Sequence, residues 1–232
     1  MVNLPTKTCL LCRSPYGDKA ITDDPYDGFC SRECRLDDYL HIYPLPNIFL
    51  HTDLERLHRA EQIARVRAWI KDREHLESFP SLLLHGQVSG TGKTRVATWA
   101  FLEQIVSWWC GRKVEREDLA TGIGGAGLWY SVATFRQKYL ECLRDCEGRA
   151  KWLQQLRTVR VLCLDDIDKF RSSEGLLELL YSILDARLLE TELTTILTTN
   201  LCGDALAERW GPEYGPYLVR RLREFSLTLN FD

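Results

Sequence analysis

A glycine-rich turn between an apolar run and a Lys-Thr pair constrains the fold of this chain more than any other feature. Apolar residues 82–84 lead into this turn, which ends at Lys93 and Thr94. A strand that enters such a turn and leaves it as a helix points backbone N–H groups and the positive end of the helix dipole at a phosphate. The pattern therefore predicts a nucleotide-binding loop, in which Lys93 reaches the terminal phosphates and the Thr94 hydroxyl binds Mg²⁺.

The loop departs from the usual G-x-x-x-x-G-K-[ST] pattern at its first glycine. Gln87 occupies that position, and the nearest glycine, Gly86, lies one residue earlier. Because the strand, turn and helix follow one another as the motif requires, we interpret the segment as a phosphate-binding loop rather than as a plain glycine turn. The residues expected to hold the nucleotide are Ser89, Gly90, Thr91, Gly92, Lys93, Thr94 and Arg95.

Two further segments resemble central strands that end in polar residues. Residues 159–164 are almost wholly apolar and lead into Asp165 and Asp166, and the β-branched run 194–199 leads into Asn200. Such runs are typical of strands in a parallel sheet, and ligands bind where these strands end. We therefore expect Asp165 to hold Mg²⁺, Asp166 to act as a general base or to orient water, and Asn200 to orient the attacking water.

In this order the motifs resemble those of the AAA+ ATPases, and more narrowly those of the DnaC/DnaI helicase loaders and the related IstB transposition ATPases. The matching segments are SGTGKT at 89–94, LCLDDID at 162–168, ILTTN at 196–200 and LVRRL at 218–222. The resemblance covers roughly residues 80–232. It implies an arginine finger in the last segment, for which Arg221 is the closest match and Arg220 the alternative.

The resemblance also implies an α/β fold, namely a P-loop AAA+ core with a parallel sheet flanked by helices. Only residues 223–232 follow the finger segment, so we expect no C-terminal lid. The implied function is an ATP-dependent helicase loader that acts on single-stranded DNA and a replicative ring helicase. Mg²⁺-dependent ATP hydrolysis would serve as its conformational switch, in a homo-oligomer whose neighbouring subunit supplies the finger. An IstB-type transposition ATPase and a nucleotide-binding adaptor with little turnover remain alternatives.

Four of the nine cysteines lie within the first 34 residues, with the spacing C-x₂-C-x₁₇-C-x₃-C. Two close pairs across a loop of this length suit a tetrahedral four-thiolate zinc site. The sequence therefore predicts a small treble-clef-like zinc module, and its ligands are Cys9, Cys12, Cys30 and Cys34. Two disulfides are the alternative, which is disfavoured because nothing in the sequence indicates secretion.

Composition and length suit one α/β domain with a small appendage. The chain has 232 residues, of which 45% are hydrophobic, and its net charge is −3. We expect a zinc module at 1–40, a linker and helix at 41–78, and an ATPase domain at 79–232. The sequence shows neither the apolar core of a signal peptide nor a run near the ~20 residues of a membrane span. This predicts a cytoplasmic protein without membrane contact, in a bacterium or, if phage-encoded, in its host.

Because the net charge is negative, any DNA binding must come from a local basic patch. The candidates are Arg112, Lys113, Arg116, Arg136 and Lys138. A helix from about residue 53 to 77 carries mixed charges, Arg73 among them, which is typical of a solvated face. Cys142 and Cys146 are expected to share one face of a later helix, as packing residues. Further helices are expected at 94–109, 134–145 and 174–190, and strands at 128–132 and near the end of the chain.

Overall fold

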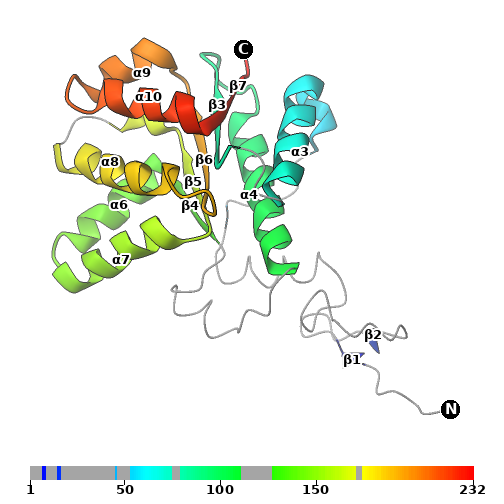
Figure 1. Ribbon diagram of the computed structural model, residues 1–232, viewed down its shortest axis with the longest axis horizontal. Coiled ribbons are helices and arrows are strands. Elements are labelled where there is room, and N and C mark those ends of the chain that lie inside the picture. The colour runs from blue at the N-terminus through cyan, green and yellow to red at the C-terminus, as the bar shows by residue number, and fades with distance from the viewer. Residues whose placement is uncertain are drawn as a thin grey trace.

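The computed structural model describes residues 7–8, 15–16, 45, 53–74, 79–110, 127–170 and 174–232. Among these residues, five parallel strands form one sheet at the centre of the molecule (Figure 1). In their order across the sheet they are β4 (Gly127–Ser131), β5 (Val161–Asp165), β6 (Thr194–Thr199), β3 (Ser81–His85) and β7 (Ser226–Asn230). Every neighbouring pair is parallel. The segments that follow β3, β5 and β6 therefore emerge together, at the carboxyl edge of the sheet.

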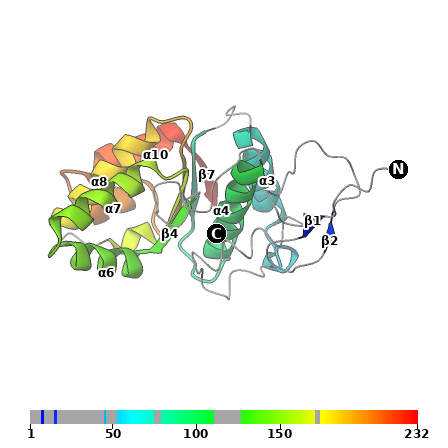
Figure 2. The same cartoon turned by 90° about the horizontal axis from the view of Figure 1, so that it is seen from below.

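Helices cover both faces of this sheet (Figures 1 and 2). One face carries α3 (Ala60–Glu74), which follows the short η1 (Glu55–Leu57), and α4 (Lys93–Cys110). The other face carries α6 (Val132–Cys142), α7 (Cys146–Thr158), α8 (Glu174–Leu188) and α10 (Gly215–Phe225). The short η2 (Ile167–Lys169) follows β5, and α9 (Gly203–Trp210) packs against α10. The result is the three-layer arrangement expected from alternating strands and helices.

Alternate residues of the central strands divide the core into two clusters. Leu82 and Leu84 of β3 join the cluster formed with α3 and α4, which includes the buried Phe101. Leu83, between them, joins the cluster on the opposite face. Because successive side chains of a strand point to opposite faces, a continuous apolar run is needed where both faces are covered.

A fully buried arginine joins the layers on the side of α8. The Arg187 guanidinium donates to Thr195 Oγ1 at 2.9 Å and to the Thr194 carbonyl at 2.7 Å. It also donates to the carbonyls of Leu156 and Val159, at 3.0 and 2.7 Å. Burial lowers the pKa of Arg187 to about 9. These bonds tie α8 to β6 and to the end of α7, and they satisfy carbonyl groups that would otherwise be buried without a partner.

The segment before the sheet differs from the expected helix over 53–77. The α-helix begins only at Ala60, because His58 adopts a left-handed conformation (φ 50°) that ends η1. Arg73, expected on a solvated face, is buried instead and donates to Thr194 Oγ1 at 3.2 Å. Burial, assisted by the nearby Arg160, lowers the pKa of Arg73 to about 10.

The helix after the phosphate-binding loop and the strand at 128–132 are confirmed to within one residue by α4 and β4. The pairing expected for two cysteines on one helix is wrong, because Cys142 ends α6 and Cys146 begins α7. Asp145 separates these helices and caps α7 by accepting from the Gly148 N–H at 3.0 Å. Neither α7 nor α9 was expected from the sequence pattern.

Near the N-terminus, β1 (Lys7–Thr8) and β2 (Pro15–Tyr16) form an antiparallel pair in which Lys7 lies opposite Tyr16. Cys9 and Cys12 lie between these strands in the sequence, but all four predicted zinc ligands fall outside the described residues. Within the described part of the chain, no helix is long and apolar enough to cross a membrane.

Candidate nucleotide-binding site

A hollow of about 240 Å³ lies at the carboxyl edge of the sheet, between the loop after β3 and the segments after β5 and β6. All seven residues predicted to hold the nucleotide line it, together with Asp166 and Asn200. Lys169, to which the sequence analysis assigned no role, lines it as well. The parallel sheet therefore brings three sequence motifs, separated by up to about a hundred residues, to one place.

Two glycines give the loop its shape. Gly90 and Gly92 have φ values of 81° and 95°, in the left-handed region that side-chain-bearing residues rarely adopt. A Cβ on Gly92 would also lie 3.0 Å from Cδ2 of Leu57, which packs against the loop from η1. Both glycines are therefore favoured by the backbone conformation, and Gly92 also by its close packing against Leu57.

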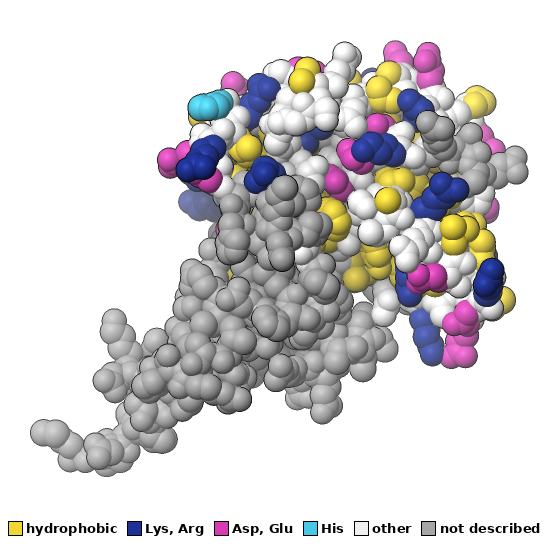
Figure 3. Space-filling view, turned by 180° about the vertical axis from the view of Figure 1, so that it is seen from behind, with side chains coloured by type: hydrophobic (Ala, Val, Ile, Leu, Met, Phe, Trp, Pro, Cys, Tyr) yellow, Lys and Arg dark blue, Asp and Glu magenta, His cyan; other side chains and the backbone are white. Residues whose placement is uncertain are grey.

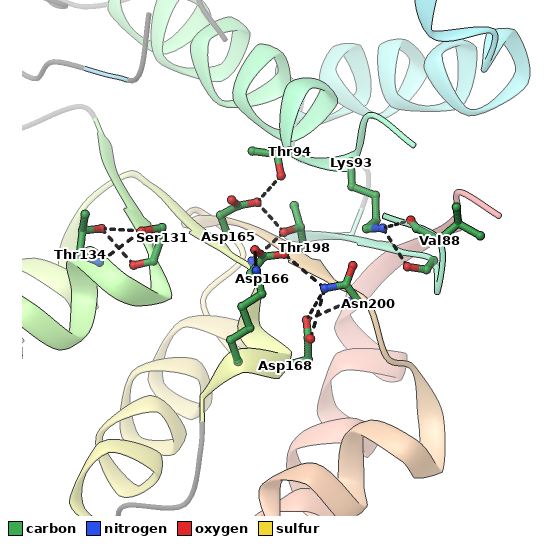
Figure 4. Close-up of polar contacts among 12 residues, drawn as sticks. Val88, Lys93, Thr94, Ser131, Thr134, Asp165, Asp166, Asp168, Thr198 and Asn200 are labelled. Carbon is green, nitrogen blue, oxygen red and sulfur yellow. Dashed lines mark hydrogen bonds and ion pairs between the residues drawn. The ribbon is translucent and has the colours of Figure 1, made fainter. Parts of the chain in front are cut away.

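Lys93 folds back onto its own loop (Figure 4). Its ammonium group donates to the carbonyls of Gly86 and Val88, at 2.8 and 3.0 Å, and to Thr91 Oγ1 at 3.4 Å. Burial lowers the pKa of Lys93, and nearby carboxylates, Asp166 first among them, oppose this effect. All three acceptors are neutral, so phosphate oxygens could replace them and would add an opposite charge on the acceptor side of the hydrogen bonds.

Asp165 ends β5 as a buried carboxylate that accepts only from hydroxyl groups among the described residues. Its Oδ1 accepts from Thr94 Oγ1 at 2.8 Å and from Thr198 Oγ1 at 2.6 Å (Figure 4). Burial raises the pKa of Asp165, and these two hydrogen bonds partly oppose the shift. The hydroxyl of Thr94 and the carboxylate of Asp165 are hard oxygen ligands in direct contact, which is the donor set that Mg²⁺ prefers.

Asp166 turns the chain sharply after β5. It has a left-handed backbone (φ 63°, ψ 46°), a conformation that Asp tolerates better than most residues. Its N–H donates to Thr198 Oγ1 at 2.8 Å, and its carboxylate forms an ion pair with Lys169. This turn places the carboxylate of Asp166 at the hollow, whereas that of Asp165 is buried behind it.

Asn200 is held by a carboxylate that sequence reasoning left without a role. Asp168 accepts from the Asn200 N–H at 2.8 Å and from its Nδ2 at 3.2 Å. The same Nδ2 lies 3.4 Å from Oδ1 of Asp166 (Figure 4). Asp168 and Thr198 were visible as the third acid of the LDDID run and the first Thr of TTN. Only the pairing of β5 with β6 shows that they orient the site.

Arg221 lies away from this hollow, on α10. Its Nε donates to the Tyr217 hydroxyl at 2.9 Å and lies 3.8 Å from Oδ1 of Asp185. Its guanidinium also covers the rings of Tyr217 and Phe225, at 5.1 and 5.6 Å. Arg220 is exposed, and its guanidinium lies 5.5 Å from the Tyr217 ring. The role of a finger therefore stays a prediction for either residue.

The remaining candidates form no cluster among the residues that the structure describes. Arg136 and Lys138 are exposed on α6, whereas Arg112, Lys113 and Arg116 lie outside the described residues. Figure 3 shows basic and acidic side chains interspersed over the described part of one face. The described residues also contain no group of three or more His, Cys, Asp or Glu side chains that could hold a metal ion.

No protein-family model and no curated protein matches the sequence, but the fold matches solved structures. One is the DnaC helicase loader (TM-score 0.59, 20% identity), where the match covers 81% of this chain and 100% of the other. A second is DnaI (TM-score 0.59, 22% identity), with coverages of 81% and 94%. A third is AMPPCP-bound DnaA from Aquifex aeolicus (TM-score 0.51, 19% identity), with coverages of 72% and 45%. The chain thus has the fold of the DnaC-type loaders, and it spans less than half the length of this DnaA chain.

Proposed function

We propose that this protein is a Mg²⁺-dependent ATPase that loads a replicative ring helicase onto single-stranded DNA in the cytoplasm. One observation carries the proposal: Lys93, Thr94, Asp166 and Asn200 line the same hollow. Thr94 is bonded there to Asp165, and Asn200 to Asp166. The fold shared with the DnaC helicase loader supports the loader reading. A DnaA structure of the same fold contains AMPPCP and single-stranded DNA, which supports ATP as nucleotide and DNA as partner.

The residues present fit a nucleotide and a magnesium ion. Among the described residues, buried Asp165 has no cationic hydrogen-bond donor, and its Oδ1 accepts from the hydroxyls of Thr94 and Thr198. These two residues would hold Mg²⁺, which when bound would neutralise charge on the phosphates. Ser89 to Arg95 would hold the phosphates through loop N–H groups and the N-terminus of α4.

The chain's own groups then have separate tasks in hydrolysis. Lys93 exchanges its carbonyl acceptors for phosphate oxygens and stabilises the charge that develops on them. Asp166 accepts a hydrogen bond from the attacking water and orients it, after its carboxylate is released from Lys169. Asn200 is fixed by Asp168, so that its amide holds the same water without a change of rotamer.

The finger belongs to the proposal as a contact between subunits of a homo-oligomer. Arg221 would reach the phosphates of a neighbouring subunit's nucleotide. Its present partners, Tyr217 and Asp185, would have to be exchanged for that contact. Arg220 is the alternative, because it is exposed on the same helix.

An ATPase assay with and without single-stranded DNA tests the enzyme, with Asp166→Asn as the variant that should bind ATP and lose turnover. Nucleotide binding without turnover in the unaltered protein would favour the adaptor. Co-purification with a ring helicase supports the loader, whereas capture of a transposase supports the IstB-type alternative.

Binding to single-stranded DNA should weaken steeply as the salt concentration rises, because it would depend on a few phosphate contacts such as those of Arg136 and Lys138.

The zinc module is a separate part of the proposal. The first cysteine pair lies between two paired strands in the sequence, which is compatible with a knuckle that presents two thiolates. About one equivalent of Zn²⁺ should co-purify, and chelation should unfold the N-terminal module while leaving nucleotide binding intact. Absence of metal from protein prepared under reducing conditions would contradict this assignment.

A further inference from the structure

Residues 230–232 pack against the first turn of the phosphate-binding loop. The Phe231 N–H donates to the His85 carbonyl at 2.7 Å, which extends the pairing of β7 with β3, and the Phe231 side chain is fully buried. The Val88 N–H donates to Oδ1 of Asp232 at 3.1 Å, across 144 positions of sequence. A carboxylate distant in the sequence therefore accepts from the loop that carries Lys93.

Asp232 is itself held from the side of α3. Arg59 donates to its backbone carbonyl at 2.9 Å, and its own N–H donates to Oδ1 of Asn230 at 3.0 Å. Gln62, on the first turn of α3, donates to the Asn230 carbonyl at 3.1 Å. The backbone of Asp232 is thus held by Arg59, just before α3, as well as by Asn230 of β7.

The two peptide groups that flank Val88 are consequently both held. Its N–H donates to Asp232, and its carbonyl accepts from the Lys93 ammonium at 3.0 Å. Gly86 allows this approach, because a Cβ there would lie 3.1 Å from Oδ1 of Asp232 and 3.2 Å from the Phe231 carbonyl carbon. A glycine at position 86 therefore suits the close approach of the last residues to the loop.

We propose that Asp232 is a positioning residue of the nucleotide site, whose carboxylate holds the Val88 N–H and thereby helps to position the Val88 carbonyl, to which Lys93 donates. This inference deepens the proposed function, because the ligand that it affects is the nucleotide. The carboxylate acts as an acceptor, and its negative charge opposes the binding of phosphates. Asn at this position keeps the acceptor and removes the charge, so the two effects can be separated.

Titration with a fluorescent ADP analogue tests the inference. Asp232→Ala should bind about tenfold more weakly, because the Val88 N–H loses its acceptor. Asp232→Asn should bind at least as tightly as the unaltered protein. Asp72→Ala, an exposed aspartate on α3, is the matched control and should change nothing. Unchanged affinity in Asp232→Ala, or equal weakening in the Ala and Asn variants, would overturn the inference.

Gly86→Ala provides a second route to the same contact. Its Cβ should displace Asp232, so the double variant Gly86→Ala/Asp232→Ala should bind no more weakly than the weaker single variant. If the fold-losses of nucleotide affinity in the two single variants multiply in the double variant, the two residues act independently and the inference is refuted.

Amide hydrogen exchange separates this inference from the proposed function. Without nucleotide, Val88 should exchange faster in Asp232→Ala and at the normal rate in Asp232→Asn. If the unaltered protein binds no nucleotide, the proposed function fails. The exchange rates then still decide whether Asp232 holds the loop, and equal rates in all three proteins would overturn that.

Discussion

The nucleotide hollow and the α8–α10 face each contain a cation that we propose to act on phosphates. The two cations differ in their present partners. Lys93, which lines the hollow, donates to neutral carbonyls, and Asp165, buried behind it, has no cationic hydrogen-bond donor among the described residues. On the α8–α10 face, Arg221 already packs over the Tyr217 ring, donates to the Tyr217 hydroxyl and pairs with the carboxylate of Asp185. The hollow is thus prepared for a ligand, whereas Arg221 is satisfied within its own chain. A role for Arg221 in another subunit's site requires that its contacts be exchanged.

The largest effect is expected from the hollow. Lys93→Ala should lower ATP hydrolysis by at least about a thousandfold, because it removes the cation that we propose to stabilise the developing charge. Nucleotide affinity should also fall, while the circular dichroism spectrum and melting temperature should remain close to those of the unaltered protein. Steady-state ATPase rates and titration with a fluorescent nucleotide measure both quantities. Unchanged hydrolysis would remove the basis of the nucleotide-site assignment.

A somewhat smaller effect is expected from the α8–α10 face. Arg221→Ala should bind ATP normally and hydrolyse it about a hundredfold more slowly, because the missing charge acts only in the transition state. Mixing it with Lys93→Ala should restore some activity, since each variant supplies what the other lacks at a shared interface. Arg220→Ala is measured in parallel, and the variant that loses hydrolysis while keeping ATP binding identifies which arginine is the finger. Rates independent of protein concentration, together with inactive mixtures, would indicate a site that works within one chain.

The smallest effect is expected on the stability of the fold. It compares the carboxylate of Asp165 at the nucleotide hollow with that of Asp185 on the α8–α10 face. The pKa of Asp165 is raised by burial above its usual 3.8. The folded state therefore holds that proton more tightly and loses stability as pH rises from 3.8 through the raised pKa. Asp165→Asn removes this loss and keeps an oxygen that can accept from both hydroxyls. Without Mg²⁺ at neutral pH, it should melt at a higher temperature than the unaltered protein, and the gap should close toward pH 4.

Asp185→Asn is the matched variant on the other face. Because Asp185 pairs with Arg221, the substitution should destabilise the fold by at most about 1 kcal/mol. Thermal melts of both variants across the pH range measure the contrast. Destabilisation by Asp165→Asn at neutral pH would show that the buried carboxylate is already compensated in the metal-free protein.

The part of the site that could be predicted from sequence consists of residues adjacent in the chain to the strand ends. Ser89 to Arg95, Asp166 and Asn200 all line one hollow, because parallel strands present their carboxyl ends together, and their roles toward a nucleotide stay predictions. Asp168 and Thr198 were missed because their partners lie in other motifs, whereas Lys169 pairs with Asp166 within its own segment and was simply overlooked. Asp232 could not be predicted at all, since its contact with Val88 spans 144 positions.

By itself, the sequence determined the nature of the sheet and of its phosphate-binding edge. Apolar runs require burial on both faces, and glycines at positive φ allow a loop that no other residues form as readily. Only the tertiary structure decided how polar groups far apart in the chain satisfy one another. It buried Arg187 against four neighbouring oxygens, closed residues 230–232 onto the loop, and gave Arg221 an intramolecular carboxylate. Hydrogen bonds and ion pairs depend on distance in space, and that distance is set by packing rather than by position in the sequence.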